Sequence, residues 1–118
     1  MNEFNSGIPI YIQVINKLKE EMALSKIKPG DKLPSSRDLA IEYSINPNTA
    51  SRVYREMELL GLCYTKRGLG TFVTEDEIMV NSIKENMAKE YTKGYVSSMG
   101  SLGYKKIEMI KLIESEEN

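Results

Sequence analysis

The sequence predicts a mostly helical protein with one small β-hairpin, an α+β class in which helices dominate. Three observations lead to this prediction. Residues 33–60 show the pattern of two short helices separated by a tight break. Short β-prone segments then flank a basic, glycine-bearing tip at residues 66–70. After residue 73, apolar side chains recur every three or four residues, which is the period of a helix. Two helices followed by a basic hairpin are typical of a winged helix-turn-helix, to which the tail adds two further helices.

The first predicted helix covers residues 10–25 and begins after Pro9. Its apolar residues share one face, as expected of a helix that supports a core. The residues of this face are Tyr11, Ile15, Leu18 and Met22.

Capping signals mark the starts of the next two helices. Ser35 is a favourable N-cap, and Asp38 follows at the spacing of a capping box, so we expect a helix that reaches Tyr43. Asn46 is expected to cap the third helix. Pro47 suits its first position, because an N–H group there would lack a helical partner anyway.

The third helix has two contrasting faces. One is an apolar stripe that ends near Gly61, where a left-handed residue is expected to close the helix. The other face carries amide, hydroxyl and guanidinium groups, which can reach base edges and phosphates in a DNA major groove. Its residues are Asn48, Thr49, Ser51, Arg52 and Arg55. We therefore expect this helix to read double-stranded DNA.

The tip of the hairpin has the composition of a second DNA contact. Lys66 and Arg67 are adjacent cations, and Gly68 and Gly70 allow a close turn of the backbone. Such a tip can lie along the phosphates or enter a minor groove.

The chain resembles the N-terminal domain of GntR-family bacterial transcription regulators over residues 8–73. The matching features are Pro29-Gly30, Leu33-Pro34-Ser35, Arg37, Leu39-Ala40, Asn46-Pro47-Asn48-Thr49, Gly61-Leu62 and Gly68-x-Gly70-Thr71-Phe72-Val73. The Asn-Pro-Asn-Thr turn and the short tail are similar to the YtrA-type subfamily. The resemblance implies that Arg37 reaches DNA, while the helix N-terminus at Ser35 and Ser36 suits a phosphate.

The charges are distributed unevenly along the chain, as expected if one part of it binds a DNA duplex. The net charge is −1, but residues 9–73 carry ten cations and seven acids, whereas residues 74–118 carry six cations and nine acids. This division favours a DNA-facing part and a part that faces water or a protein partner.

The tail at residues 74–118 is predicted to form helices over about 74–98 and 104–114, the first with a capping box at Thr74 and Glu77. Two such helices cannot enclose a large core, so their apolar residues need a partner. The tail could pack on its own domain, but a second copy is favoured, because dimeric readers match two-fold operators. The expected dimer contacts are Val80, Ile83, Met87, Tyr91, Tyr95, Ile110 and Ile113.

The composition argues against an enzyme. The chain has no histidine, and its single cysteine, Cys63, suits a reducing cytoplasm. We find no catalytic constellation, no metal ligand set and no cofactor motif. No segment has the length and apolarity of a membrane span. Response to a small-molecule effector is an additional role that the tail could have.

The leading hypothesis is a cytoplasmic regulator, a repressor that binds a pseudo-palindromic operator as a homodimer and controls a transporter operon. The alternative is a winged-helix module that contacts proteins without specific DNA binding. A protein-contact face should carry exposed aromatic residues. The polar face of the third helix carries amides, hydroxyls and arginines instead, which favours DNA.

Overall fold

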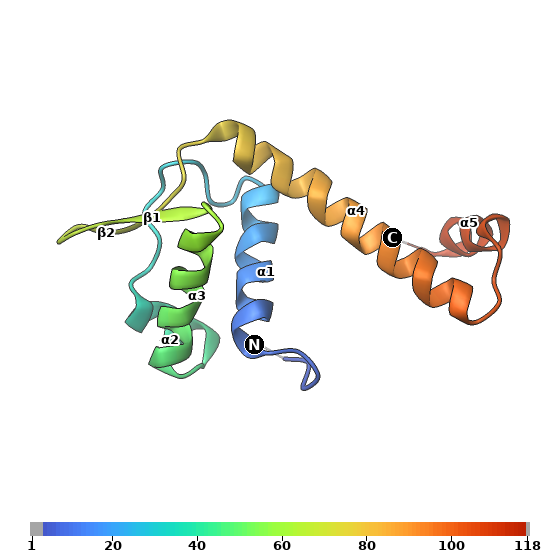
Figure 1. Cartoon of the computed structure of the whole chain (residues 1–118), viewed down its shortest axis with the longest axis horizontal. Coiled ribbons are helices and arrows are strands. Elements are labelled where there is room, and N and C mark those ends of the chain that lie inside the picture. The colour runs from blue at the N-terminus through green and yellow to red at the C-terminus, as the bar shows by residue number, and fades with distance from the viewer. Residues whose placement is uncertain (1–3, 118) are drawn as a thin grey trace. The chain divides into compact units, whose positions relative to one another are not determined.

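The computed structural model describes residues 4–117 and is built from helices and one small hairpin (Figure 1). The chain forms two compact units that divide between Lys84 and Glu85. The described elements are α1 (Ile10–Ala23), α2 (Ser36–Tyr43), α3 (Pro47–Leu59), β1 (Cys63–Lys66), β2 (Gly70–Val73), α4 (Glu77–Ser101) and α5 (Lys106–Ser115). The mostly helical class with a hairpin wing is therefore confirmed.

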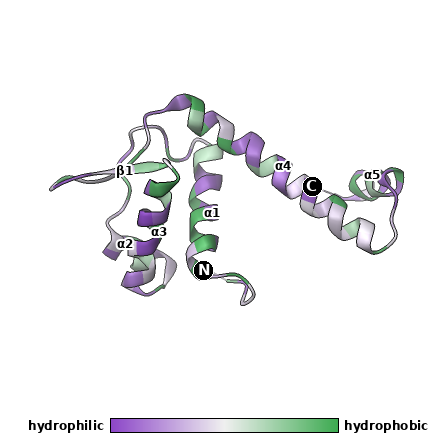
Figure 2. Cartoon of the chain, in the orientation of Figure 1, coloured by the Kyte–Doolittle hydropathy of each residue, from purple (hydrophilic) through white to green (hydrophobic). Residues whose placement is uncertain are grey.

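The core of the first unit lies where α3 packs against both α1 and α2. Three of the four predicted core residues of α1 are buried, and Val14 joins them as a fully buried side chain. Tyr11 was expected in this core but is only half-buried. Figure 2 shows the hydrophobic residues that run along α1. Burial of such side chains stabilises the unit by about 25 cal/mol for each Å² of apolar surface removed from water.

Both predicted helix caps are present in the helix-turn-helix. The Ser35 hydroxyl accepts a hydrogen bond from the Asp38 N–H at 3.0 Å, and the Asn46 side chain accepts one from the Asn48 N–H at 2.7 Å. Gly61 follows Leu60, the C-cap of α3, and has a φ of +78°, which confirms the left-handed residue expected there.

The hairpin is an antiparallel pair whose two faces differ. Cys63 pairs with Val73, and both are buried. Tyr64 pairs with Phe72 on the other face, where the two rings stack with centroids 5.8 Å apart. The chain before α2 also anchors β2, because the Leu33 N–H donates to the Thr71 carbonyl oxygen at 2.8 Å.

The start of α4 differs from the prediction. Asp76, rather than Thr74, caps the helix: its carboxylate accepts hydrogen bonds from the Ile78 and Met79 N–H groups, each at 3.1 Å. The Thr74 hydroxyl accepts instead from the Asp76 N–H at 3.2 Å, so it shapes the turn before the helix. Two cap-forming side chains stand two residues apart, and the later one begins the helix.

The end of α4 and the start of α5 also lie later than predicted. Helix α4 passes through Gly100 to Ser101, and the break falls at Gly103, whose φ is +90°. In the second unit, the Tyr95 hydroxyl donates to the Met109 carbonyl oxygen at 2.9 Å, which fastens α5 to α4. None of the helices within residues 4–117 combines the length and apolarity needed to span a membrane.

The compact units do not by themselves assign roles to parts of the chain. The first turns of α4 belong to the unit that contains the helix-turn-helix. The functional division into a DNA-binding domain at residues 8–73 and a tail at 74–118 therefore stays a prediction.

Candidate nucleic-acid interface

One face of α3, its inner face, is buried in the core, so the opposite, outer face points to solvent. Ala50, Val53 and Met57 are fully buried, and Tyr54 is 6% exposed. The Tyr54 hydroxyl donates to the Pro34 carbonyl oxygen at 2.6 Å, which ties α3 to the chain before α2. Burial, above all, raises the pKa of Tyr54. The hydroxyl is therefore protonated at neutral pH and can donate this hydrogen bond.

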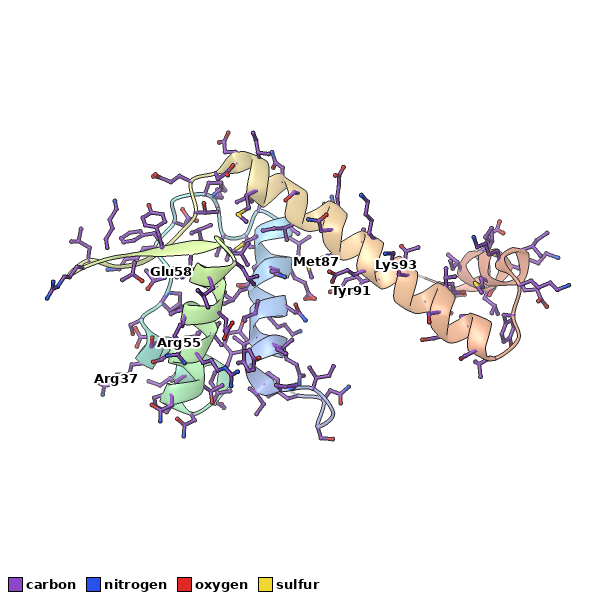
Figure 3. The ribbon with its side chains drawn as sticks, viewed as in Figure 1. Arg37, Arg55, Glu58, Met87, Tyr91 and Lys93 are labelled. Carbon is purple, nitrogen blue, oxygen red and sulfur yellow. The ribbon has the colours of Figure 1, made fainter. Side chains whose placement is uncertain are left out.

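The outer face of α3 carries the polar residues expected from the sequence. Asn48, Ser51, Arg52 and Arg55 are exposed, whereas Thr49 is half-buried at the edge. Figure 3 labels Arg55 on α3 and Arg37 on α2. The structure thus brings amide, hydroxyl and guanidinium donors together along one side of a single helix.

Arg52 differs from its predicted environment. Its guanidinium lies over the ring of Tyr11 in α1, 3.9 Å from the ring centroid, and its Nε is 3.9 Å from a carboxylate oxygen of Glu56. The helical spacing placed Arg52 opposite the apolar stripe but could not show that α1 supplies a ring beside it. Tyr11 is therefore a residue of this surface that the sequence did not identify.

The N-terminus of α2 adds a second group of polar residues. Arg37 is exposed in the first turn, and Ser36 is half-buried beside it. The Ser35 oxygen is engaged as the cap, which leaves its hydroxyl hydrogen for an acceptor such as a phosphate oxygen. This geometry is compatible with the expected phosphate contact.

The wing presents its cations on the predicted turn. Lys66 and Arg67 are exposed, and Gly68 has a φ of +80° with no side chain or backbone close to the position of a Cβ. The Lys66 ammonium lies 5.2 Å from the centroid of the Phe72 ring and 5.7 Å from that of Tyr64. These rings hold one cation of the tip near the strands, while Arg67 is exposed on the turn.

Gly70 has a different role from Gly68. Its φ is +125°, and a Cβ there would lie 2.9 Å from Cε of Lys32. The glycine therefore leaves room for the Lys32 side chain beside the tip end of β2, where Gly70 pairs with Lys66. The sequence contained no signal for this third cation, because the contact depends on how the preceding chain pairs with β2.

A cavity of about 580 Å³ separates α3 from the wing. Its lining mixes polar and apolar surface and comes from α2, α3 and both strands: Ser36, Ser51, Tyr54, Arg55, Glu58, Leu59, Thr65 and Thr71. The Thr65 hydroxyl donates to a Glu58 carboxylate oxygen at 2.9 Å, and Figure 3 labels Glu58 on α3. This hydrogen bond joins the wing to α3, a contact that the sequence had not indicated.

Cys63 lies behind this surface as a structural residue. Its thiol donates to the Tyr54 carbonyl oxygen at 3.7 Å. Burial, and next the Glu58 carboxylate, raise the pKa of the thiol to about 11, which keeps it protonated and unreactive at neutral pH.

The predicted dimer residues fall into two groups. Val80, Ile83 and Met87 are buried within the single chain. Tyr91, Ile110 and Ile113 are more than half exposed, and Tyr95 is half-buried with its hydroxyl bound to the α5 backbone. Figure 3 labels Met87 and Tyr91 on α4. The exposed residues of the second unit are therefore the ones that another chain can reach.

Helices α2 and α3 are both capped and are joined through Ser44, whose φ is +54°. Together with the polar outer face of α3 and the basic hairpin that follows, they define a winged helix-turn-helix protein. Residues 10–73 match the family model "Bacterial regulatory proteins, gntR family". The chain belongs to the GntR family, as the motifs in its sequence had indicated.

Full-length relatives are similar along nearly the whole chain. The "Uncharacterized HTH-type transcriptional regulator YhcF" of Bacillus subtilis is 41% identical over 97% of this chain and 94% of its own length. The "HTH-type transcriptional repressor YtrA" of the same organism is 40% identical over 92% of this chain and 82% of its own length. The similarity to YtrA-type members is thus confirmed. The family and these relatives are regulators of transcription and not enzymes, as expected.

Solved structures support both the fold and the kind of site. A "GntR family transcriptional regulator from Listeria monocytogenes" aligns with a TM-score of 0.89 and 34% identity, over 97% of this chain and all of the other. The DNA-binding domain of AraR in complex with operator ORE1 aligns with a TM-score of 0.55 and 26% identity, over 63% of this chain and 93% of the other.

Proposed function

We propose that this GntR-family regulator is a homodimeric repressor that binds a pseudo-palindromic operator in the bacterial cytoplasm. The observation that carries the proposal is the outer face of α3, which presents exposed polar residues while the opposite face is buried. These proposed DNA contacts are Asn48, Ser51, Arg52 and Arg55. A helix of this kind fits a major groove, and its amide and guanidinium groups match the donor and acceptor pattern of base edges.

The roles of the other predicted DNA contacts follow from their chemistry. Arg37, together with the α2 N-terminus at Ser35 and Ser36, is assigned to phosphates, because helix N-termini and guanidinium groups both favour anions. Lys66 and Arg67 of the wing are assigned to the backbone or the minor groove, since two cations on a turn carry charge but little base information.

The exposed apolar residues of the second unit support the dimer. Ile107, Ile110 and Ile113 of α5 are between 56% and 64% exposed and follow one another at three-residue steps, and Tyr91 of α4 is 59% exposed. Such a group of large apolar side chains is costly to leave in water and suits an interface between two copies. The buried residues Val80, Ile83 and Met87 then support α4 from within the chain.

The repressor role rests on the relatives. YtrA, which matches most of this chain, is a transcriptional repressor. A protein that occupies an operator without a large effector domain can act by blocking transcription, and we assign it a transporter operon as its target. Expression of neighbouring transport genes, compared between cells with and without the protein, tests this target. Higher expression in its absence is expected, and lower or equal expression would contradict it.

Selection of duplexes from a randomised library by the full-length protein tests the DNA-binding proposal. The enriched sequences should contain two inverted half-sites whose centres lie about one helical turn apart, roughly 34–36 Å, or a multiple of it. Enrichment of a single, unrepeated half-site would contradict the dimer. Absence of any enriched sequence would favour a winged helix that contacts proteins.

A further inference from the structure

The contact between Tyr11 and Arg52 joins the support helix to the reading helix. Arg52 lies on α3 and Tyr11 on α1, two helices that pack against each other. The guanidinium carbon is 3.9 Å from the centroid of the tyrosine ring, yet half of the Arg52 side-chain surface remains exposed. The cation is thus held on one side and open to solvent on the other.

The chemistry of a guanidinium explains why this contact is compatible with DNA binding. Its N–H donors lie in the plane of the group, so a ring that covers one face leaves the donors at its edge available. A carboxylate oxygen of Glu56 is 3.9 Å from Nε, the nitrogen that joins the guanidinium to the side-chain stem. The terminal N–H groups therefore remain for an acceptor outside the protein.

A second effect is entropic. An exposed arginine occupies many rotamers, and it loses most of them when it binds a base or a phosphate. A ring that restricts the side chain in the free protein reduces this loss at the moment of binding.

We propose that Tyr11 is a positioning residue of the DNA-reading surface, whose ring holds the Arg52 guanidinium ready for an acceptor on the duplex. The proposal deepens the proposed function and rests on it, because it takes Arg52 as a DNA contact. It assigns to α1 a part in recognition, in addition to its part in the core.

Two substitutions distinguish the effect of the Tyr11 ring from that of its hydroxyl. Tyr11→Leu removes the π-face and keeps an apolar side chain, whereas Tyr11→Phe keeps the ring and is the matched control. The probe is a duplex that the unaltered protein has enriched from a randomised library. Tyr11→Leu should weaken binding roughly three- to thirty-fold, the range of a cation–π contact. Tyr11→Phe should bind within about twofold of the unaltered protein, since the ring is what acts. Equal losses in both variants would assign the effect to the hydroxyl and overturn the proposal.

A double-mutant cycle shows whether Tyr11 acts through Arg52. In an Arg52→Ala background, Tyr11→Leu should cost no further affinity, because the group that it positions is gone. An undiminished loss in that background would show a merely structural role for Tyr11 and would overturn the proposal. Thermal unfolding of each variant checks that the protein still folds.

An NMR measurement on the free protein does not depend on DNA. The Arg52 side-chain protons should be shifted upfield by the ring in the unaltered protein and in Tyr11→Phe, and this shift should disappear in Tyr11→Leu. If the unaltered protein shows the shift but Arg52→Ala leaves affinity unchanged, Arg52 is not a DNA contact and does not belong to the proposed DNA-reading surface. If Arg52→Ala weakens binding but Tyr11→Leu does not, only the positioning role fails.

Discussion

Arg55 is the single residue whose removal should most directly weaken recognition without disturbing the fold. It is exposed, and it lines the cavity between α3 and the wing together with Ser36 and Ser51. Arg55→Ala should reduce binding of the selected duplex by about 1–3 kcal/mol per half-site, the usual value of one good arginine contact. Because the side chain is exposed, the free energy of unfolding should not change.

Lys89→Ala is the matched control for Arg55→Ala. It removes the same charge from an exposed position on α4. Fluorescence anisotropy with labelled DNA measures both variants. A similar reduction in the two would mean that only net charge matters, and would contradict a specific contact by Arg55.

Alkaline pH should destabilise the protein through Cys63. Burial raises the pKa of its thiol from 9.0 to about 11 in the folded protein. The folded state therefore holds this proton more tightly than the unfolded state, so the contribution to stability is complete below pH 9 and is lost as pH rises toward 11. Urea unfolding should show a free energy of unfolding that falls as pH rises above 9.

Cys63→Ala removes this titration and should flatten the fall between pH 9 and pH 10, even if the smaller side chain lowers stability at every pH. Above pH 10 a decline should remain, because burial also raises the pKa of Tyr43 from 10.0 to about 12. An unchanged pH dependence in Cys63→Ala would contradict the assignment to the thiol.

The wing as an element should contribute charge rather than base reading. Replacing both Lys66 and Arg67 with alanine should weaken binding to selected and shuffled duplexes alike, because phosphates are present in both. The slope of log affinity against log salt should fall by about 1 for each phosphate that the wing no longer neutralises.

The control for the wing is a Lys26→Ala, Lys28→Ala variant, which removes two exposed cations after α1. It should leave the salt slope close to that of the unaltered protein. If the wing variant kept its salt slope and changed only its preferred bases, the wing would be a sequence reader instead.

The helix starts could be predicted where the side chain that caps the helix bonds to a backbone group close to it in the sequence. The caps of α2 and α3 were identified because Ser35 and Asn46 bond to backbone N–H groups only two or three residues away. The predicted start of α4 was wrong because Thr74 and Asp76 can both act as caps, and sequence spacing alone does not choose between them. Helix α4 also continued through Gly100, whose cost of about 1 kcal/mol does not end a helix.

The parts of the site that could not be predicted from the sequence are contacts between different helices and strands. The Tyr11 ring beside Arg52, and the Lys32 side chain beside Gly70, depend on how segments distant in the chain pack together. Helical periodicity gives the direction of a side chain from its own helix axis. It gives no information about which residue of another helix stands there.

For the whole molecule, the exposed face of α5 should decide the oligomeric state. Ile110→Asp would place a carboxylate without a partner in the proposed interface, which is unfavourable. The variant should sediment as a monomer at tens of micromolar, a usual range for weakened dimers. Its affinity for a two-half-site duplex should fall by about 10²–10⁴, because the second half-site is no longer bound intramolecularly.

Ile78→Asp is the control for the dimer. Ile78 is 83% exposed in the first turn of α4 and belongs to the first unit. This variant should remain dimeric. If the unaltered protein were itself a monomer, or if both variants dissociated equally, α5 would not be the dimer contact.

Equilibrium binding of the full-length protein to the selected duplex and to a shuffled duplex of the same composition tests the central claim most directly, at salt concentrations between about 50 and 200 mM. The selected duplex should bind at least about 10³-fold more tightly than the shuffled one, with both affinities falling linearly in log salt. Equal affinity for the two duplexes throughout this range would contradict a sequence-specific regulator.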